Sequence, residues 1–317
     1  MREVAKCILP TFRCVLTAVA CRPIGPNPSA SAIITRVTDP PMPAFSVVIP
    51  AHNEEAVIMR ALDAFVPDLR QGEAQVVVVP NGCTDRTAEL SRSIAGVETL
   101  DIAVASKSAA LNAGDRHARG FPRIYVDADV VLNADTLRAL ATALAGPAPR
   151  VASPTVRFNV DGRPWSVRAF HRVYEKLPYI DDALIGHGVY ALSAAGRARF
   201  DEFPTVTADD LFVQRLFTTA ERIILDAHFV DVQTPKTLRS LLAIRTRTAY
   251  GNRQLAAVSQ DTHAASTRTT ISALGRVIRA EPQILPAAAV YVGVTLVARM
   301  KAKRRAASVW QRDTSTR

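Results

Sequence analysis

Apolar runs rich in β-branched residues alternate with amphipathic segments from residue 45 onward. Such runs are typical of strands covered on both faces, as in a parallel sheet, whereas an apolar stripe of period 3.6 is typical of a surface helix. Strands are predicted at 45–50, 75–79, 97–103, 123–130, 151–158 and 223–232, with an apolar segment at 183–192. Helices are predicted at 55–69, 107–119, 135–144, 165–177 and 237–255, with two more beginning at the caps Thr84 and Thr207. This alternation predicts an α/β fold built on a mostly parallel sheet.

Three polar loops follow strands of the predicted sheet. They cover residues 51–54, 80–85 and 127–129. Ligands of mostly parallel sheets bind where the carboxyl ends of the strands meet. We therefore expect these loops to converge on one ligand site.

The third loop carries two carboxylates, Asp127 and Asp129, at the end of an otherwise apolar strand. Side chains at positions i and i+2 of an extended strand point the same way, so both can approach one hard divalent cation. Mg²⁺ or Mn²⁺ held by one or two carboxylates completes its shell with water and phosphate oxygens, which suits a diphosphate ligand. The competing interpretation is a capped helix start that leads into residues 133–135.

The chain has 317 residues and a formal net charge of +10, with the excess of arginine towards its C-terminus. No zinc-finger spacing or aromatic RNA-binding signature accompanies this charge, so no nucleic-acid partner is expected. An acidic membrane face or a nucleotide diphosphate accounts for it instead. The four cysteines form no disulfide pattern and are interpreted as reduced small hydrophobic residues.

The two ends of the chain differ from its middle. Residues 1–43 are rich in proline and without periodicity, which predicts an extension outside the core. Residues 256–269 are polar and are expected to be mobile. Residues 284–298 are apolar throughout and are followed by five basic residues between 299 and 305, which is typical of the cytoplasmic edge of a membrane. Because the apolar run is short for a perpendicular span, an interfacial helix, a crossing helix and a buried core helix remain open.

The three loops together resemble those of the family 2 inverting glycosyltransferases. Residues 45–55, FSVVIPAHNEE, resemble the family's opening strand and donor loop, and residues 76–87 resemble the second donor loop, with Pro80 and Asn81 in place of two acids. Residues 107–114, KSAALNAG, resemble the segment near the ribose and phosphates, and the Asp127-Ala-Asp129 triplet matches the metal-binding Asp-x-Asp. The resemblance covers residues 45–220. It implies a GT-A fold, Rossmann-like, at 44–235. The hydrophobic pattern beyond this domain predicts C-terminal helices at 236–283 and an apolar, membrane-associated segment with a basic tail at 284–317.

The resemblance also implies roles for individual residues. Asp127 and Asp129 would hold Mg²⁺ or Mn²⁺, and Asp209 or Asp210 would be the catalytic base. The acceptor side would include Gly186, His187 and Gly188. The donor nucleotide sugar would meet Pro50, His52, Asn53, Glu54, Asn81, Gly82, Asp85, Lys107, Asn112 and Asp127. The choice between the two candidate bases stays open. Counting back from Arg215 favours Asp209, whereas matching Asp209-Asp210 to the family's usual Glu-Asp pair favours Asp210.

The implied reaction moves one sugar from a nucleotide-diphosphate sugar to an acceptor hydroxyl with inversion. The Gln-x-x-Arg-Trp motif of processive members is absent from the region that contains Arg245 and Arg247, which favours one transfer per event. A lipid-linked or cell-envelope glycan is the expected acceptor, at the cytoplasmic side of the cell membrane. A catalytically silent membrane-associated scaffold is the alternative. A nucleotidyltransferase ranks lower, because residues 50–54 lack a Gly-rich phosphate loop.

Overall fold

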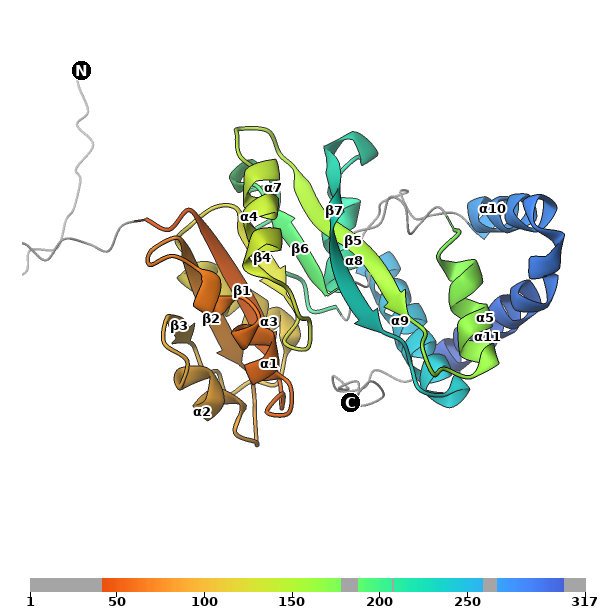
Figure 1. The fold of residues 1–317 in the computed structure, drawn as a ribbon, viewed down its shortest axis with the longest axis horizontal. Coiled ribbons are helices and arrows are strands. Elements are labelled where there is room, and N and C mark those ends of the chain that lie inside the picture. Colours follow the sequence, from red (N-terminus) through yellow and green to blue (C-terminus); the bar gives the residue numbers. More distant parts are fainter. Residues whose placement is uncertain (1–41, 178–187, 207, 259–266, 305–317) are drawn as a thin grey trace, which may run out of the picture. The chain divides into compact units, whose positions relative to one another are not determined.

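The computed structural model describes residues 42–177, 188–206, 208–258 and 267–304, and all of these belong to one compact unit, Pro40–Arg317 (Figure 1). The predicted extension at 1–43 lies outside the described residues except for its last two. Gly186, His187 and residues 259–266 of the segment expected to be mobile also lie outside the described residues.

A sheet of seven strands runs through the described residues, in the order β3-β2-β1-β4-β6-β5-β7. The strands are β1 (Phe45–Ala51), β2 (Ala74–Pro80), β3 (Val97–Thr99), β4 (Arg123–Val126), β5 (Val151–Asn159), β6 (Val189–Leu192) and β7 (Arg222–Gln233). β6 runs antiparallel to both of its neighbours, whereas the remaining pairs are parallel. The predicted α/β fold with a mostly parallel sheet is confirmed.

Helices cover the faces of the sheet. They are α1 (Ile58–Asp63), α2 (Thr87–Arg92), α3 (Lys107–His117) and α4 (Ala134–Ala143), with a 3₁₀ turn at Val66–Asp68 after α1. Every residue of β1 is buried, and β2 is buried from its second residue onward. This explains the unbroken Val and Ile runs, because both faces of these strands lie in a core.

Several element boundaries differ from the sequence prediction. The helix predicted at 55–69 is shortened to α1, and the strand predicted at 97–103 is shortened to β3. Thr84 is not an N-cap, because α2 begins at Thr87. The hydroxyl of Thr84 instead donates to the side-chain oxygen of Asn53 at 3.3 Å. The turn before α2 is closed by Asp85, whose carboxylate accepts from the Thr87 backbone N–H at 3.0 Å.

A buried ionic cluster joins α3, β4 and the short helix α7 (Ala194–Arg197). The carboxylate of Asp115 lies 3.0 Å from a guanidinium nitrogen of Arg123 and 2.8 Å from one of Arg197. It also accepts a hydrogen bond of 2.6 Å from the hydroxyl of Tyr125. Two arginines therefore depend on one buried carboxylate, and removing it would leave buried charge without compensation.

A second ion pair holds α4 to the turn before β2. Arg138 donates from Nε and Nη2 to the two carboxylate oxygens of Glu73, at 2.7 and 3.0 Å. It also donates to the backbone carbonyl of Asp68 at 2.8 Å. The hydrogen bonds from Arg138 lower the pKa of Glu73 to about 2.

A second hydrophobic core lies beyond the sheet. It is formed by α5 (Trp165–Tyr174), α9 (Leu238–Val258), α10 (Thr267–Ala280) and α11 (Leu285–Arg304), with a 3₁₀ turn at Pro282–Ile284. The long strands β5 and β7 run side by side towards these helices (Figure 1). Residues 256–258 and 267–269, expected to be mobile, instead belong to α9 and α10.

Within the described residues, Pro282–Arg304 is the helical stretch long and apolar enough to cross a membrane by length and composition, and a third of its most apolar window is buried. That buried part packs on α5 and α9. Tyr291 of α11 stacks on Phe170 of α5 with ring centroids 5.2 Å apart. Arg253 of α9 donates to the carbonyl of Ala302 at 2.9 Å.

Candidate active site

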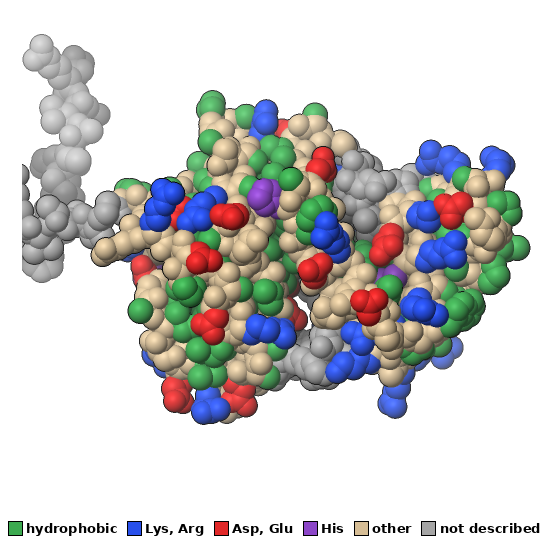
Figure 2. All heavy atoms as spheres, in the orientation of Figure 1, with side chains coloured by type: hydrophobic (Ala, Val, Ile, Leu, Met, Phe, Trp, Pro, Cys, Tyr) green, Lys and Arg blue, Asp and Glu red, His purple; other side chains and the backbone are tan. Residues whose placement is uncertain are grey.

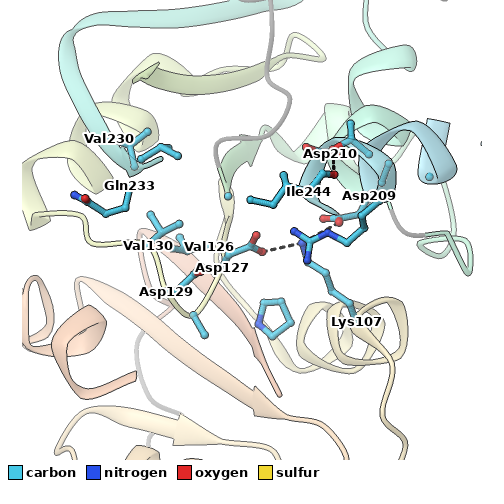
Figure 3. A pocket seen from close by; sticks show the side chains of 18 of the residues that line it. Lys107, Val126, Asp127, Asp129, Val130, Asp209, Asp210, Val230, Gln233 and Ile244 are labelled. Atoms are coloured by element: carbon cyan, nitrogen blue, oxygen red, sulfur yellow. Dashed lines mark hydrogen bonds and ion pairs between the residues drawn. The ribbon is translucent and has the colours of Figure 1, made fainter. Parts of the chain in front are cut away.

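A cavity of about 530 Å³ opens at the carboxyl ends of β1, β2 and β4 (Figure 3). Its far wall is formed by the end of β7 and by α9, and the helix α8 (Asp209–Arg215) closes one side. The three polar loops predicted to converge do meet at this cavity. Of the predicted site residues, those that line it are Pro50, His52, Glu54, Asn81, Lys107, Asp127, Asp129, Gly188, Asp209 and Asp210.

The first two loops are held together by hydrogen bonds between them. The Nδ1–H of His52 donates to the carbonyl of Asn81 at 2.5 Å, and the backbone N–H of Glu54 donates to the hydroxyl of Thr87 at 2.7 Å. The Asn81 side chain donates from Nδ2 to the carbonyl of Ala51 at 2.8 Å. The two acceptors near this Nδ2 are the backbone carbonyls of Ala51 and Val79, which fixes the orientation of the side-chain amide. The buried Oδ1 of Asn81 has no hydrogen-bond partner among the described residues.

Four predicted donor residues lie outside the lining of the cavity. Asn53 and Asp85 join the two loops: the Asn53 side chain accepts from the Thr84 N–H at 2.7 Å, and Asp85 accepts from the Glu55 N–H at 3.2 Å. Gly82 donates from its N–H to a backbone carbonyl at 2.8 Å. Asn112 exchanges two hydrogen bonds with the backbone of residue 203, at 2.7 and 3.1 Å. Their roles as donor ligands stay predictions.

The two aspartates of the third loop lie in a turn, not on the strand. β4 ends at Val126, and the backbone N–H of Val130 donates to the carbonyl of Asp127 at 3.0 Å. The prediction of a strand to residue 130 is therefore wrong, because the described partner strands pair with β4 only over residues 123–126. Both carboxylates still reach the cavity, Asp129 from an exposed position.

Gly188 lies against Asp127. The backbone N–H of Asp127 donates to its carbonyl at 2.7 Å. Gly188 has a φ of +67°, and a Cβ there would lie 2.6 Å from Val130 and 3.2 Å from the carboxylate oxygen Oδ2 of Asp127. Glycine is required at this position both by the left-handed backbone and by the space that the carboxylate occupies.

Lys107, the first residue of α3, lies between two carboxylates. Its ammonium nitrogen is 2.8 Å from Oδ1 of Asp127 and 2.9 Å from Oδ1 of Asp209 (Figure 3). Burial opposes the charge of the ammonium, but the two carboxylates outweigh burial and raise the pKa of Lys107 above its ordinary value. The lysine is therefore cationic at neutral pH.

The two candidate bases begin α8 and differ in their surroundings. Asp209 is buried, and its second oxygen accepts a hydrogen bond of 3.1 Å from the hydroxyl of Tyr190. Burial and the nearby Asp209 carboxylate raise the pKa of Tyr190, so its phenol stays protonated and donates. Asp210 is less buried, and one of its oxygens accepts from the backbone N–H of Leu211 at 2.8 Å.

The donor set of this cavity fits a hard divalent cation. No group of three or more His, Cys, Asp or Glu side chains is placed to hold a metal in the described part of the chain. Mg²⁺ and Mn²⁺ need only one or two carboxylates when phosphate oxygens and water complete the shell, which Asp127 and Asp129 can supply. The ammonium of Lys107 already lies against Asp127, so the cavity floor accommodates a cation.

The contribution of α5 to the cavity wall was missed by the sequence reasoning, which singled out only Arg245 and Arg247 of α9 in this part of the chain. His171 and Tyr174 of α5 and Arg245 of α9 line the cavity. Arg245 lies 4.9 Å from the ring centre of Tyr174, and burial lowers the pKa of His171, which keeps its imidazole neutral at neutral pH. Helix periodicity could place these residues on helices, but no sequence signal indicated which helices face the loops.

Residues 46–202 match the model of glycosyl transferase family 2. The chain is similar to the mannosyltransferase PcManGT from Pyrobaculum calidifontis, solved in complex with GDP-Man and Mn²⁺, with 25% identity, a TM-score of 0.56, and coverage of 84% of this chain and 81% of that one.

Two curated relatives come from Trichomonas vaginalis. The dolichyl-phosphate beta-glucosyltransferase ALG5A is 28% identical over 37% of this chain and 40% of its own. The related ALG5D is 31% identical over 32% of this chain and 35% of its own. The chain thus spans less than half the length of these relatives. With the family match, the mostly parallel sheet and the cavity at its carboxyl edge together, the chain belongs to glycosyl transferase family 2 and has the GT-A fold.

Proposed function

We propose that this protein transfers a single sugar from a nucleotide-diphosphate sugar to an acceptor hydroxyl, with inversion at the anomeric carbon. The observation that carries the proposal is the meeting of Asp127, Asp129, Lys107 and the Asp209–Asp210 pair in one cavity. Cation-binding carboxylates, a fixed ammonium and further carboxylates are the groups needed to stabilise a diphosphate leaving group and to deprotonate a hydroxyl.

On the donor side, Asp127 and Asp129 would hold Mg²⁺ or Mn²⁺, which neutralises developing charge on a diphosphate when bound. Lys107 supplies a second positive charge at the same floor. Asn81, which is fully buried, holds the first two loops together at this floor through its hydrogen bond to Ala51. PcManGT was solved with GDP-Man and Mn²⁺, which supports both a nucleotide-sugar donor and a divalent ion here.

On the acceptor side, Asp209 or Asp210 takes the proton of the attacking hydroxyl. The acceptor oxygen forms a bond to the anomeric carbon as the bond from that carbon to the diphosphate breaks on the opposite face. The nucleoside diphosphate leaves with the electron pair, and no covalent intermediate forms. Tyr190 and Lys107 hold both oxygens of Asp209 in place, so this carboxylate is rigidly oriented for the task.

The acceptor is proposed to be lipid-linked, at the cytoplasmic side of the cell membrane. The two curated relatives are dolichyl-phosphate glucosyltransferases, which supports a lipid-linked acceptor. The apolar helix α11 and the basic residues at its end support a membrane location.

The base is tested with Asp209→Asn and Asp210→Asn, each measured for nucleotide binding and for nucleoside diphosphate release from a panel of nucleotide sugars. The variant of the true base should lose turnover by about a hundredfold or more and keep its donor affinity. Asp161→Asn changes an exposed aspartate outside the cavity and serves as the matched control. NMR of the anomeric proton during transfer reports inversion directly.

Two results would contradict the proposal. Normal turnover in both variants would exclude each aspartate as the base. Nucleotide binding with no turnover of any donor by the wild-type protein would favour the catalytically silent scaffold. The scaffold has two observations in its favour. Pro80 and Asn81 replace the two acids of the second donor loop, and Ala208 stands where the family usually has Glu before its aspartate.

A further inference from the structure

Helix α11 is apolar on two opposite faces. One face is buried in the second core and includes Ala287, Tyr291, Val294 and Ala298. The opposite face carries large side chains that are exposed. They are Leu285 (58% exposed), Val292 (38%), Leu296 (53%) and Met300 (56%). A helix that is apolar all round lies in a core or in a lipid environment, and the packing on α5 and α9 accounts for one face only.

The four exposed side chains form one continuous stripe. Residues 285, 292, 296 and 300 are separated by seven, four and four positions, which places them on one side of an α-helix. Ile271 of the neighbouring helix α10 adds a fifth large apolar side chain and is 65% exposed. We call these five residues the α10–α11 stripe. Exposed large apolar side chains aligned along α11 in this way mark an interaction site.

The charge around the stripe indicates its partner. Residues 267–304 contain seven basic residues and one acidic residue, Glu281. Glu281 is already paired with Lys176, two residues after the end of α5, at 2.6 Å. Arg276, Arg279 and Arg299 are exposed. Lys and Arg side chains gather over this end of the protein together with hydrophobic ones (Figure 2). Apolar side chains flanked by lysine and arginine match an anionic lipid surface, because the apolar groups enter the bilayer while the cations reach the headgroups.

The packing of α11 decides how it meets a bilayer. A crossing helix would have to leave α5 and α9, which would expose the face that carries Tyr291 and Val294 and would break the hydrogen bond from Arg253 to Ala302. A helix that stays packed presents only its outer face to lipid. We propose that the α10–α11 stripe docks flat on an anionic membrane surface, so that α11 lies in the interface and does not cross the bilayer.

This inference rests on the membrane placement in the proposed function and adds how the site reaches its acceptor. Helix α9 lines the active-site cavity with Ile244, Arg245 and Thr248, and it also packs against α11. Helices α5 and α9 thus lie between the cavity and α11, which carries the docking face. A lipid-linked acceptor held in the same membrane would meet the cavity from the α9 side.

The test is sedimentation of the full chain with vesicles of phosphatidylcholine, alone or mixed with phosphatidylglycerol. Binding is expected to the mixed vesicles and to fall as salt is raised. The double variant Val292→Glu/Leu296→Glu should lower the partition constant by about a hundredfold or more, since each inserted CH₂ group contributes about fourfold. Arg276→Gln/Arg279→Gln should lower it about thirtyfold, at about fivefold for each cation near the surface.

Controls separate docking from folding and from catalysis. Val104→Glu/Val131→Glu places the same charges at exposed valines, which are 62% and 44% exposed, and should bind vesicles as the wild type does. The stripe variant should keep its melting temperature and its nucleotide affinity, because its substituted side chains are exposed. Nucleotide binding is measured on every variant, so failure of docking and failure of the donor site are seen independently.

Three results would overturn the inference. The first is absence of binding to mixed vesicles by the wild type. The second is a membrane fraction that resists extraction by alkaline carbonate, which would show a crossing helix. The third is a dimer in sedimentation velocity that the stripe variant abolishes, which would show that the stripe joins two copies of the chain.

Discussion

Replacing Lys107 by Met should change metal affinity and nucleotide affinity in opposite directions. The ammonium lies 2.8 Å from Asp127 and 2.9 Å from Asp209, so the two carboxylate oxygens are less than about 6 Å apart. Without the lysine they repel by about 3 kcal/mol at an effective dielectric constant of about 20. Solvent reduces this to about 1–2 kcal/mol, because the Asp127 side chain is 38% exposed.

A divalent ion relieves that repulsion. The variant should therefore bind Mn²⁺ alone about tenfold more tightly than the wild type, since about 1.4 kcal/mol corresponds to tenfold. It should bind a nucleoside diphosphate in the presence of Mn²⁺ more weakly, because a cation near the phosphates has been removed. Free Mn²⁺ is measured by electron paramagnetic resonance and nucleotide binding by calorimetry.

The matched control is Lys176→Met. Lys176 also forms an ion pair, with Glu281 at 2.6 Å, but it lies outside the cavity lining. Its replacement should leave both affinities unchanged. If Lys107→Met binds Mn²⁺ no more tightly than the wild type, the lysine does not compete for the metal-site carboxylate and the reasoning is wrong.

Three further predictions concern folding and the cavity floor. Gly188→Ala should destabilise the protein by about 1 kcal/mol or more and should weaken Mn²⁺-dependent nucleotide binding. Gly162 has a similar φ of +66° with open space around it, so Gly162→Ala should lower thermal stability alone. Equal nucleotide affinity in the two variants would refute the role of the close contact at Gly188. Asp115→Asn should lower the free energy of unfolding, measured in urea, by about 3–5 kcal/mol. Glu202→Gln removes one partner of an exposed ion pair and should change that free energy by less than about 1 kcal/mol. Similar losses in the two variants would contradict the stabilising role of the buried Asp115 cluster. Because the folded pKa of Glu73 is about 2, below its ordinary value of 4.5, its stabilising effect is present above pH 4.5 and is lost as pH falls towards 2. Acid titration of Glu73→Gln should show a shallower loss over that window, and an unchanged titration would contradict this assignment.

The sheet and its ligand edge could be predicted because their signal is local. The Val and Ile runs of β1 and β2 are the direct consequence of burial on both faces. Because these strands are parallel, the polar loops that follow them lie at the same edge of the sheet. The geometry of the Asp127–Asp129 turn was not predictable, because it depends on where antiparallel β6 stops pairing with β4.

The far wall of the cavity was beyond the sequence for a different reason. Arg245 reaches Tyr174 across 71 positions, and Asp209 meets Tyr190 and Lys107 from three separate elements. Such contacts follow from tertiary packing, and the periodicity within one helix does not indicate which other element that helix packs against. The buried Asp115 cluster was missed in the same way, since its arginines come from β4 and α7.

The measurement that tests the central claim most directly is binding of a panel of nucleoside diphosphates to the full chain, with and without Mn²⁺, beside an Asp129→Ala variant. A glycosyltransferase site at the carboxyl edge of the sheet predicts metal-dependent binding of one nucleotide, weakened in the variant. That nucleotide would also name the base to use in the sugar screen. Absent binding, or binding that is independent of both Mn²⁺ and Asp129, would contradict the account and give the two aspartates a structural role.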